Sequence, residues 1–281
     1  MNPTNANSIH SRELHWATLG AVSEVGNVRK QNEDRFLLEP WADESAILAV
    51  VADGMGGNRG GSRAAEIAIN TFKELLDKPL PTSDRAIYDH LLEKFYQADE
   101  SIRTEGSQSF QLVGMGATVV AAIITPDTLI HLYAGDSRLY HIRADSSLYK
   151  TADHSIIRIL LEVGKITEDQ IEHHPMRSAV NSCLGGREGT GQFTIDPKWD
   201  EENSPVRQIQ NRDIILLSSD GLHGRLSDER IQEFATQNAD NPQQLLHTLV
   251  QHALDTGGRD NLTGLTIYRK PNTSPNTAET P

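Results

Sequence analysis

Aspartates next to apolar runs are the residues whose type and spacing could do chemistry in this chain. Asp53 follows the run 50–52 and precedes Gly54, and Asp220 follows the run 214–217 and also precedes a glycine. Asp136 lies at a Gly-Asp-Ser-Arg turn, and Asp260 precedes the last apolar run. A carboxylate at the end of a strand is held by a rigid sheet, and an adjacent glycine lets backbone approach a ligand. The pattern predicts a rim of carboxylates at one edge of a sheet.

Two more acids, Glu33 and Asp34, precede the apolar residues that begin at Phe36. Several carboxylates on one rim repel one another unless cations bind between them. Oxygen ligands without His or Cys favour Mg²⁺ or Mn²⁺ over zinc. Each Asp-Gly taken alone is more often a turn than a ligand, so the residues by themselves favour metal binding only modestly.

Other catalytic motifs are missing from the sequence. The glycine-rich run 54–61 has P-loop spacing, but Ser62 stands where that loop needs lysine, and Arg59 replaces the third glycine of a dinucleotide-binding fingerprint. No Gly-x-Ser-x-Gly motif surrounds Ser218 or Ser219, so nothing supports a serine nucleophile.

Composition excludes further classes of protein. The 281 residues include 26 Lys and Arg against 39 Asp and Glu, a net charge of −13 that argues against nucleic-acid binding. The single cysteine, Cys183, excludes an internal disulfide framework and a cysteine-built zinc site. The N-terminus has no apolar signal segment, and no apolar run approaches the ~20 residues that span a bilayer. We expect a cytoplasmic protein without a membrane partner.

The elements that must position these acids come in clusters of strands and helices. This clustering favours an α+β fold with antiparallel sheets over a doubly wound sheet. Strands are predicted at 16–22, 36 onward, 47–51, 117–124, 129–134, 139–143, 213–218 and 262–268. The runs 129–134 and 139–143 are predicted to form a hairpin around Asp136. Helices are predicted at 62–76, 85–103, 228–236 and 242–254.

The chain is predicted to hold one domain, residues 13–269, between disordered tails at 1–12 and 270–281, which are rich in Asn, Thr, Ser and Pro. Within the domain, residues 153–186 are predicted to form a helical flap, with a turn at Gly164. Such an insertion is either an ordinary surface excursion or a lid beside a site.

Six blocks of sequence, in order, resemble the metal-dependent protein phosphatases, the PPM or type-2C family, in their bacterial form. They cover nearly the whole chain and are 26–34 (GNVRKQNED), 51–57 (VADGMGG), 116–118 (GAT), 134–138 (AGDSR), 219–221 (SDG) and 258–261 (GRDN). Any one block is weak evidence, but six in order are specific. The resemblance implies a central sandwich of two antiparallel sheets, flanked by pairs of helices, with metals in a cleft at one end.

The resemblance also implies roles for five residues in a site for two tightly bound Mg²⁺ or Mn²⁺ ions. Asp53 corresponds to the carboxylate that bridges the two ions, and the Gly54 carbonyl to a ligand of one. Asp220 and Asp260 correspond to ligands of the other ion, and Glu33 to a residue that acts through a metal-bound water.

Two further roles follow from the same resemblance. Asp136 corresponds to a ligand of a third, weaker metal ion, and Arg29 to the arginine that binds the substrate phosphate. The chain departs from the family at Met55 and Asn58, where relatives can carry histidine. These two departures leave the general acid unassigned.

The implied activity is metal-dependent hydrolysis of phosphoserine and phosphothreonine in phosphorylated proteins, opposing a Ser/Thr kinase. Two alternatives stay open at this point. One is a pseudophosphatase or binding module with the same fold, and the other is a hydrolase of small phosphoesters.

Overall fold

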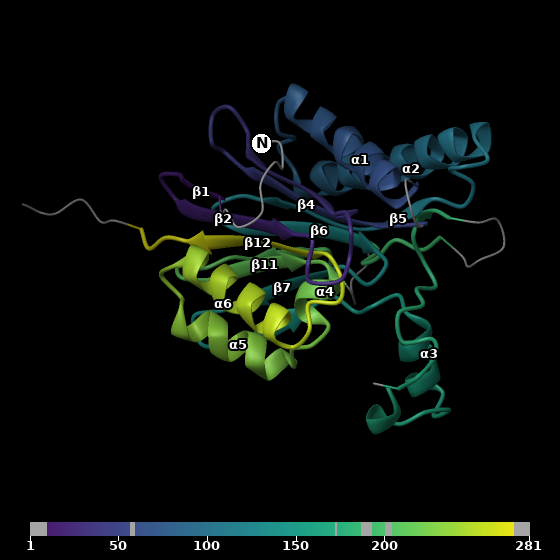
Figure 1. Cartoon of the computed structure of the whole chain (residues 1–281). Helices are drawn as coiled ribbons and strands as arrows, with labels where there is room; N and C mark the ends of the chain where they lie inside the picture. Colours follow the sequence, from purple (N-terminus) through teal and green to yellow (C-terminus); the bar gives the residue numbers. More distant parts are fainter. Residues whose placement is uncertain (1–9, 57–59, 172, 187–192, 200–203, 273–281) are drawn as a thin grey trace, which may run out of the picture.

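The computed structural model describes residues 10–56, 60–171, 173–186, 193–199 and 204–272, and two antiparallel sheets form its centre (Figure 1). The first sheet has the order β1 (His10–Glu13), β2 (Ala17–Glu24), β12 (Leu262–Arg269), β11 (Ile214–Ser218), β7 (Arg138–Ile142) and β8 (Leu148–Lys150). The second has the order β10 (Val206–Gln208), β6 (Thr128–Ala134), β5 (Gly116–Ile124), β4 (Ile47–Met55) and β3 (Arg35–Pro40), and β9 (Leu184–Gly185) pairs with β5.

Helices cover the outer face of each sheet (Figure 1). The second sheet packs against α1 (Gly60–Lys73), η1 (Glu74–Asp77) and α2 (Asp84–Gln108). The first sheet packs against α4 (Asp220–His223), α5 (Asp228–Gln237) and α6 (Pro242–Asp255). None of the described helices has the length and apolar character needed to cross a bilayer.

Burial on both faces explains the continuous apolar run of β4. Successive side chains of a strand point to opposite faces. Ile47, Ala49 and Val51 therefore pack between the two sheets, whereas Leu48 and Val50 pack against the α1 layer. The resulting four-layer arrangement of helices, sheet, sheet and helices confirms the predicted fold class.

The predicted hairpin around Asp136 is wrong. The strand before this turn, β6, belongs to the second sheet, and the strand after it, β7, belongs to the first. Residues 135–137 therefore carry the chain from one sheet to the other. An apolar run, a tight turn and another apolar run look alike in sequence whether the strands pair with each other or with different neighbours.

Parts of the two predicted disordered tails are ordered. His10–Glu13 forms β1, with His10 opposite Ala21 and Arg12 opposite Leu19. At the other end, the Lys270 ammonium donates to the Leu14 carbonyl and pairs with Glu13. Residues 1–9 and 273–281 lie outside the described residues.

The predicted helical flap contains two short helices. They are α3 (Ile156–Glu162) and η2 (Glu168–Gln170), separated by Gly164, whose φ of 65° suits glycine. The α3 region projects from the body of the molecule (Figure 1).

Candidate metal centre

Five aspartates meet at one end of the sandwich. Asp53 lies near the end of β4, Asp220 begins α4, Asp260 precedes β12, Asp34 precedes β3, and Asp136 lies in the turn between the sheets. The negative charges of the other four all raise the pKa of Asp53, after burial as the largest cause. Asp53 and Asp220 are also in hydrogen-bond contact. The structure therefore brings together all four aspartates predicted from the sequence.

Close backbone contacts hold these loops in place. A Cβ on Gly54 would lie 2.2 Å from the Gly61 carbonyl oxygen, so only glycine lets β4 approach the start of α1. A Cβ on Gly221 would lie 2.0 Å from the Asn261 carbonyl oxygen. Glycine at that position lets the helix that begins at Asp220 approach the loop that carries Asp260.

Asn261 ties the N-terminal loop to the last strand. Its side-chain NH₂ donates to the carbonyl oxygens of Val25 and Gln31, each at 3.0 Å, and its Oδ1 accepts from the backbone N–H of Glu33 at 2.9 Å. One amide thus fixes the loop bearing Glu33 next to Asp260. Its only sequence signal was its place in the last motif block.

Asp34 is a member of the centre that the motif correspondence did not assign. Its carboxylate is 2 % exposed and accepts a hydrogen bond from the Ser219 hydroxyl at 2.7 Å. Burial, with Asp220 and Asp260 nearby, raises the pKa of Asp34 to about 7, although bonds from Ser219 and Thr263 oppose the shift. The one indication of this role in the sequence was the position of Asp34 just before a predicted strand.

Other carboxyl groups in the centre also hold protons more tightly than usual. Burial, followed by the charge of Asp260, raises the pKa of Asp220 to about 6. Burial and the charges of Asp220 and Asp153 raise the pKa of Asp136 well above its usual range. Burial also raises the pKa of Glu33. So many close carboxylates cannot all ionise unless positive charge enters between them.

The donor set fits a hard divalent cation. Oxygens Oε1 of Glu33 and Oδ1 of Asp34 are buried and have no hydrogen-bond partner. Buried carboxylate oxygens are costly without a donor or a cation. Carboxylates suit Mg²⁺ or Mn²⁺. Within the described ranges, no group of three or more His, Cys, Asp or Glu side chains is placed so that it could by itself hold a metal ion. The fit therefore rests on the chemistry of the donors and on their unpartnered oxygens.

Arg29 lies at the rim of the same centre. Its Nη2 donates to Oδ2 of Asp260 at 2.9 Å, and this hydrogen bond is the main cause that raises the pKa of the guanidinium. The side chain is half exposed, so its remaining N–H groups can reach an incoming anion. Sequence reasoning placed Arg29 near the substrate but missed its direct contact with Asp260.

The first residues of the flap form hydrogen bonds on both sides of the Asp136 turn. Arg138 makes two 2.6 Å hydrogen bonds to Asp153. The backbone N–H of His154 donates to the Gly135 carbonyl at 2.9 Å, and Gly135 N–H donates to Nδ1 of His154 at 3.2 Å. The position of Asp136 is therefore coupled to the first two residues of the flap.

The structure describes only one of the two positions at which the chain departs from the family. Met55 is the partly buried last residue of β4. Asn58 lies outside the described residues.

Comparison with known proteins decides the family. The sequence profile of the family described as protein phosphatase 2C matches residues 27–262, most of the chain. This chain belongs to the protein phosphatase 2C family. The resemblance recognised in the six sequence blocks is thereby confirmed.

Relatives of this phosphatase occur in several bacteria. The Listeria innocua serine/threonine phosphatase stp is 29% identical over 248 residues, which cover 88% of this chain and 94% of that protein. The crystal structure of the Mycobacterium tuberculosis serine/threonine phosphatase PstP/Ppp is 29% identical, with a TM-score of 0.75, and covers 91% of this chain and 100% of that one. A PstP catalytic domain in complex with two manganese ions is 28% identical, with a TM-score of 0.71, and covers 91% and 99% respectively.

Proposed function

We propose that this phosphatase hydrolyses phosphoserine and phosphothreonine in proteins, using water and two bound Mg²⁺ or Mn²⁺ ions. The observation that carries the proposal is the partly buried cluster of carboxylates around Asp53, with buried, unpartnered oxygens on Glu33 and Asp34. Support also comes from the serine/threonine phosphatases that are similar over most of the chain, one of them a complex with two manganese ions.

We assign the ligand roles from the motif positions. Asp53 would bridge the two ions, and the Gly54 carbonyl would complete one site with Glu33 acting through water. Asp220 and Asp260 would bind the other ion. When bound, the cations supply positive charge to the phosphoryl group and lower the pKa of a water molecule.

The chain's own residues provide orientation and charge balance. Arg29 would donate to the equatorial phosphate oxygens, where charge spreads in the transition state. Its bond to Asp260 fixes the guanidinium at the rim, so less conformational freedom is lost when substrate binds. Asp136 would bind a third ion that shares Asp220. We expect this ion to be bound more weakly, because a site with fewer carboxylates binds its cation less tightly.

The physiological role that we propose is reversal of a Ser/Thr kinase acting on the same phosphoproteins. A hydrolase of this specificity needs a substrate that a kinase has phosphorylated. Comparison of phosphopeptides in cells with and without the gene would identify these substrates.

The test compares two variants on two substrates. Asp53→Asn removes the bridging charge, whereas Asp127→Asn makes the same change at an exposed aspartate at the opposite end of β6. We expect Asp53→Asn to lose at least 100-fold in phosphopeptide turnover and to bind Mn²⁺ more weakly by calorimetry. The Asp127 variant should match the parent.

Three results would contradict parts of this proposal. Unchanged Mn²⁺ affinity in the Asp53 variant would refute the bridging role. Turnover of p-nitrophenyl phosphate without phosphopeptide turnover would indicate a small-phosphoester hydrolase. Metal binding with neither activity would indicate a pseudophosphatase.

A further inference from the structure

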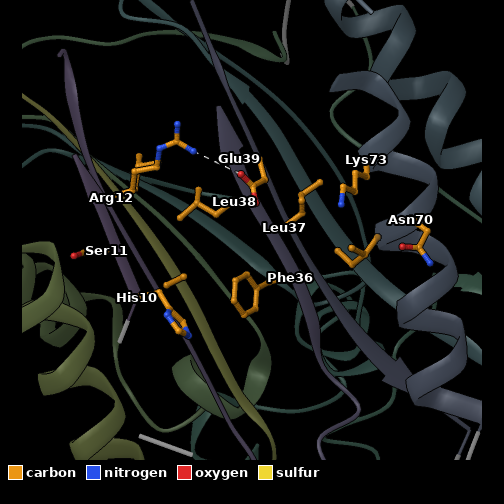
Figure 2. Close-up of a pocket in the computed structure, with 12 residues that line it drawn as sticks. His10, Ser11, Arg12, Phe36, Leu37, Leu38, Glu39, Asn70 and Lys73 are labelled. Atoms are coloured by element: carbon orange, nitrogen blue, oxygen red, sulfur yellow. Dashed lines mark ion pairs between the residues drawn. The ribbon is translucent and has the colours of Figure 1, made fainter. Parts of the chain in front are cut away.

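A groove lies along the open side of the sandwich, where both sheets end. β1 is the last strand of the first sheet, and β3 is the last strand of the second. The groove encloses about 140 Å³ and is lined by residues of β1, β2, β3 and α1 (Figure 2). A cavity of about 150 Å³ holds a benzene-sized group, so this groove has room for one large apolar side chain.

The floor of the groove is apolar and its rim is basic. Phe36 and Leu38 of β3 are only partly buried and face the space between the sheets. Arg12 of β1 and Lys73 of α1 are on the rim, with Glu39 as the acidic residue among those that line the groove. Two basic side chains therefore face one acidic side chain here, on a chain whose net charge is −13.

The two basic residues differ in their partners. Arg12 forms an ion pair with Glu39, with 3.8 Å between Nη1 and Oε2, so its charge is partly balanced. Lys73 is exposed, and no described carboxylate pairs with its ammonium. An acidic ligand would therefore gain most from Lys73.

The unpaired edge of β3 favours a peptide over a small amphipathic anion as the ligand of the groove. β3 pairs with β4 on one side, and no other described strand pairs with its second edge. A free strand edge presents backbone N–H and C=O groups that an extended peptide can pair with. A fatty-acid anion offers no such groups.

Strand geometry matches the apolar floor and Lys73 to the two faces of an added strand. Alternate side chains of such a strand would point to opposite faces. Along β3, Phe36 and Leu38 face the other sheet, whereas Leu37 faces the helix layer with Lys73. Apolar side chains on one face would thus meet the floor, and acidic side chains on the other would meet Lys73.

We propose that this groove binds an acidic peptide segment of a partner protein, in extended conformation against β3, with an apolar anchor residue between the sheets. The groove begins at Phe36, two residues after Asp34, and extends to Glu39. Because a strand rises about 3.3 Å per residue, Glu39 lies about 16 Å along the chain from Asp34. The groove is therefore a docking surface beside the metal centre but separate from it.

The test measures binding without turnover, so it does not depend on the proposed phosphatase activity. The probe is a fluorescein-labelled peptide, Glu-Asp-Phe-Asp-Leu-Asp-Glu, which places Phe and Leu on one face and three Asp on the other. Fluorescence anisotropy with the full chain should show saturable binding. Lys73→Glu should weaken binding at least tenfold, and Arg12→Ala should weaken it less. Lys78→Glu, the same change at an exposed lysine outside the groove, should stay within twofold.

Peptide variants separate the parts of the proposal. Methylation of the backbone nitrogens of alternate residues should remove binding, because a methylated nitrogen cannot pair with β3. Replacement of Phe and Leu by Gly should weaken binding at least tenfold. The circular dichroism spectrum and the Tm of the Lys73 variant should match those of the parent, which shows that the variant folds.

Several outcomes would overturn the assignment. These are absence of saturable binding, equal binding by the Lys73 and Lys78 variants, or equal binding of the methylated peptide. Decanoate displacing the peptide at equal concentration would assign the groove to an amphipathic small anion instead. Concentration-dependent dimerisation lost in Lys73→Glu would assign it to a second copy of the chain.

Discussion

Replacing Asp34 by Asn should stabilise the metal-free protein above pH 7. The buried carboxyl of Asp34 has a pKa of about 7 against an ordinary value of 3.8, a rise of about three units. Each unit corresponds to about 1.4 kcal/mol, so keeping this group ionised costs the folded state about 4 kcal/mol at pH 8. Neighbouring carboxyls can take up part of the cost by sharing protons, and we expect a gain of about 2 kcal/mol in Asp34→Asn.

The local contacts favour the substitution. Asn keeps an oxygen that can accept the Ser219 hydroxyl bond, 2.7 Å long in the parent. It also places an NH₂ group where Oδ1 of Asp34 is buried without a partner, next to other carboxylates.

The sign of the pH dependence follows from the raised pKa. Below about pH 3.8 the carboxyl is protonated in both folded and unfolded chains, so the variant gains nothing there. Between pH 4 and pH 7 the unfolded chain releases its proton first, and the parent loses stability relative to the variant. Above pH 7 the difference is constant.

Differential scanning calorimetry in EDTA at pH 4 and pH 8 measures this effect. For a domain of this size, about 2 kcal/mol corresponds to a rise in Tm of about 4–8 °C at pH 8. Saturating Mn²⁺ should at least halve the gap, because the cation offsets the charge that the variant lacks. Asp127→Asn serves as control. Equal Tm values at pH 8, or an equal gain at pH 4, would refute the reasoning.

Three further variants test individual contacts. Arg29→Ala should raise KM for a phosphopeptide about tenfold without weakening Mn²⁺ binding measured by calorimetry, and an unchanged kcat/KM would contradict a role in phosphate binding. Asp136→Ala should keep the fold and two tightly bound ions but lose most phosphopeptide turnover, whereas full turnover at saturating Mn²⁺ would leave only a turn-forming role. Asp153→Asn should leave Arg138 without its paired carboxylate, and we expect faster proteolysis within the flap and lower phosphopeptide turnover. The control Glu162→Gln, on the exposed face of α3, should change neither the proteolysis nor the turnover.

The sequence allowed a correct prediction of the fold class and of the aspartates that gather at one end. Strand-end acids are local features, because an apolar run followed by Asp and Gly fixes both the element and the position of the carboxylate. That is why Asp53 and Asp220 could be placed without knowing which strands pair. Asp260 was placed by the apolar run that follows it.

Features that depend on strand pairing could not be predicted in the same way. The residues around Asp136 read as a hairpin turn, although the turn joins two sheets. Asn261 bonds to residues more than 200 positions earlier in the chain, so no local pattern reveals its role. Edge strand β1 is too short and too exposed to produce an apolar pattern.

The position of β12 has a consequence for protein synthesis. This last strand lies between β2 and β11, and Asp260 immediately precedes it. By contrast, the strands β3 to β6 and helices α1 and α2 come from one continuous stretch of chain, 35–134. During translation the four strands β3 to β6 of the second sheet can pair while the ribosome is still elongating the chain. The first sheet stays open between β2 and β11 until β12 emerges. The carboxylate cluster is therefore incomplete until Asp260 and β12 join it, and a chain that stops before β12 lacks one of its aspartates.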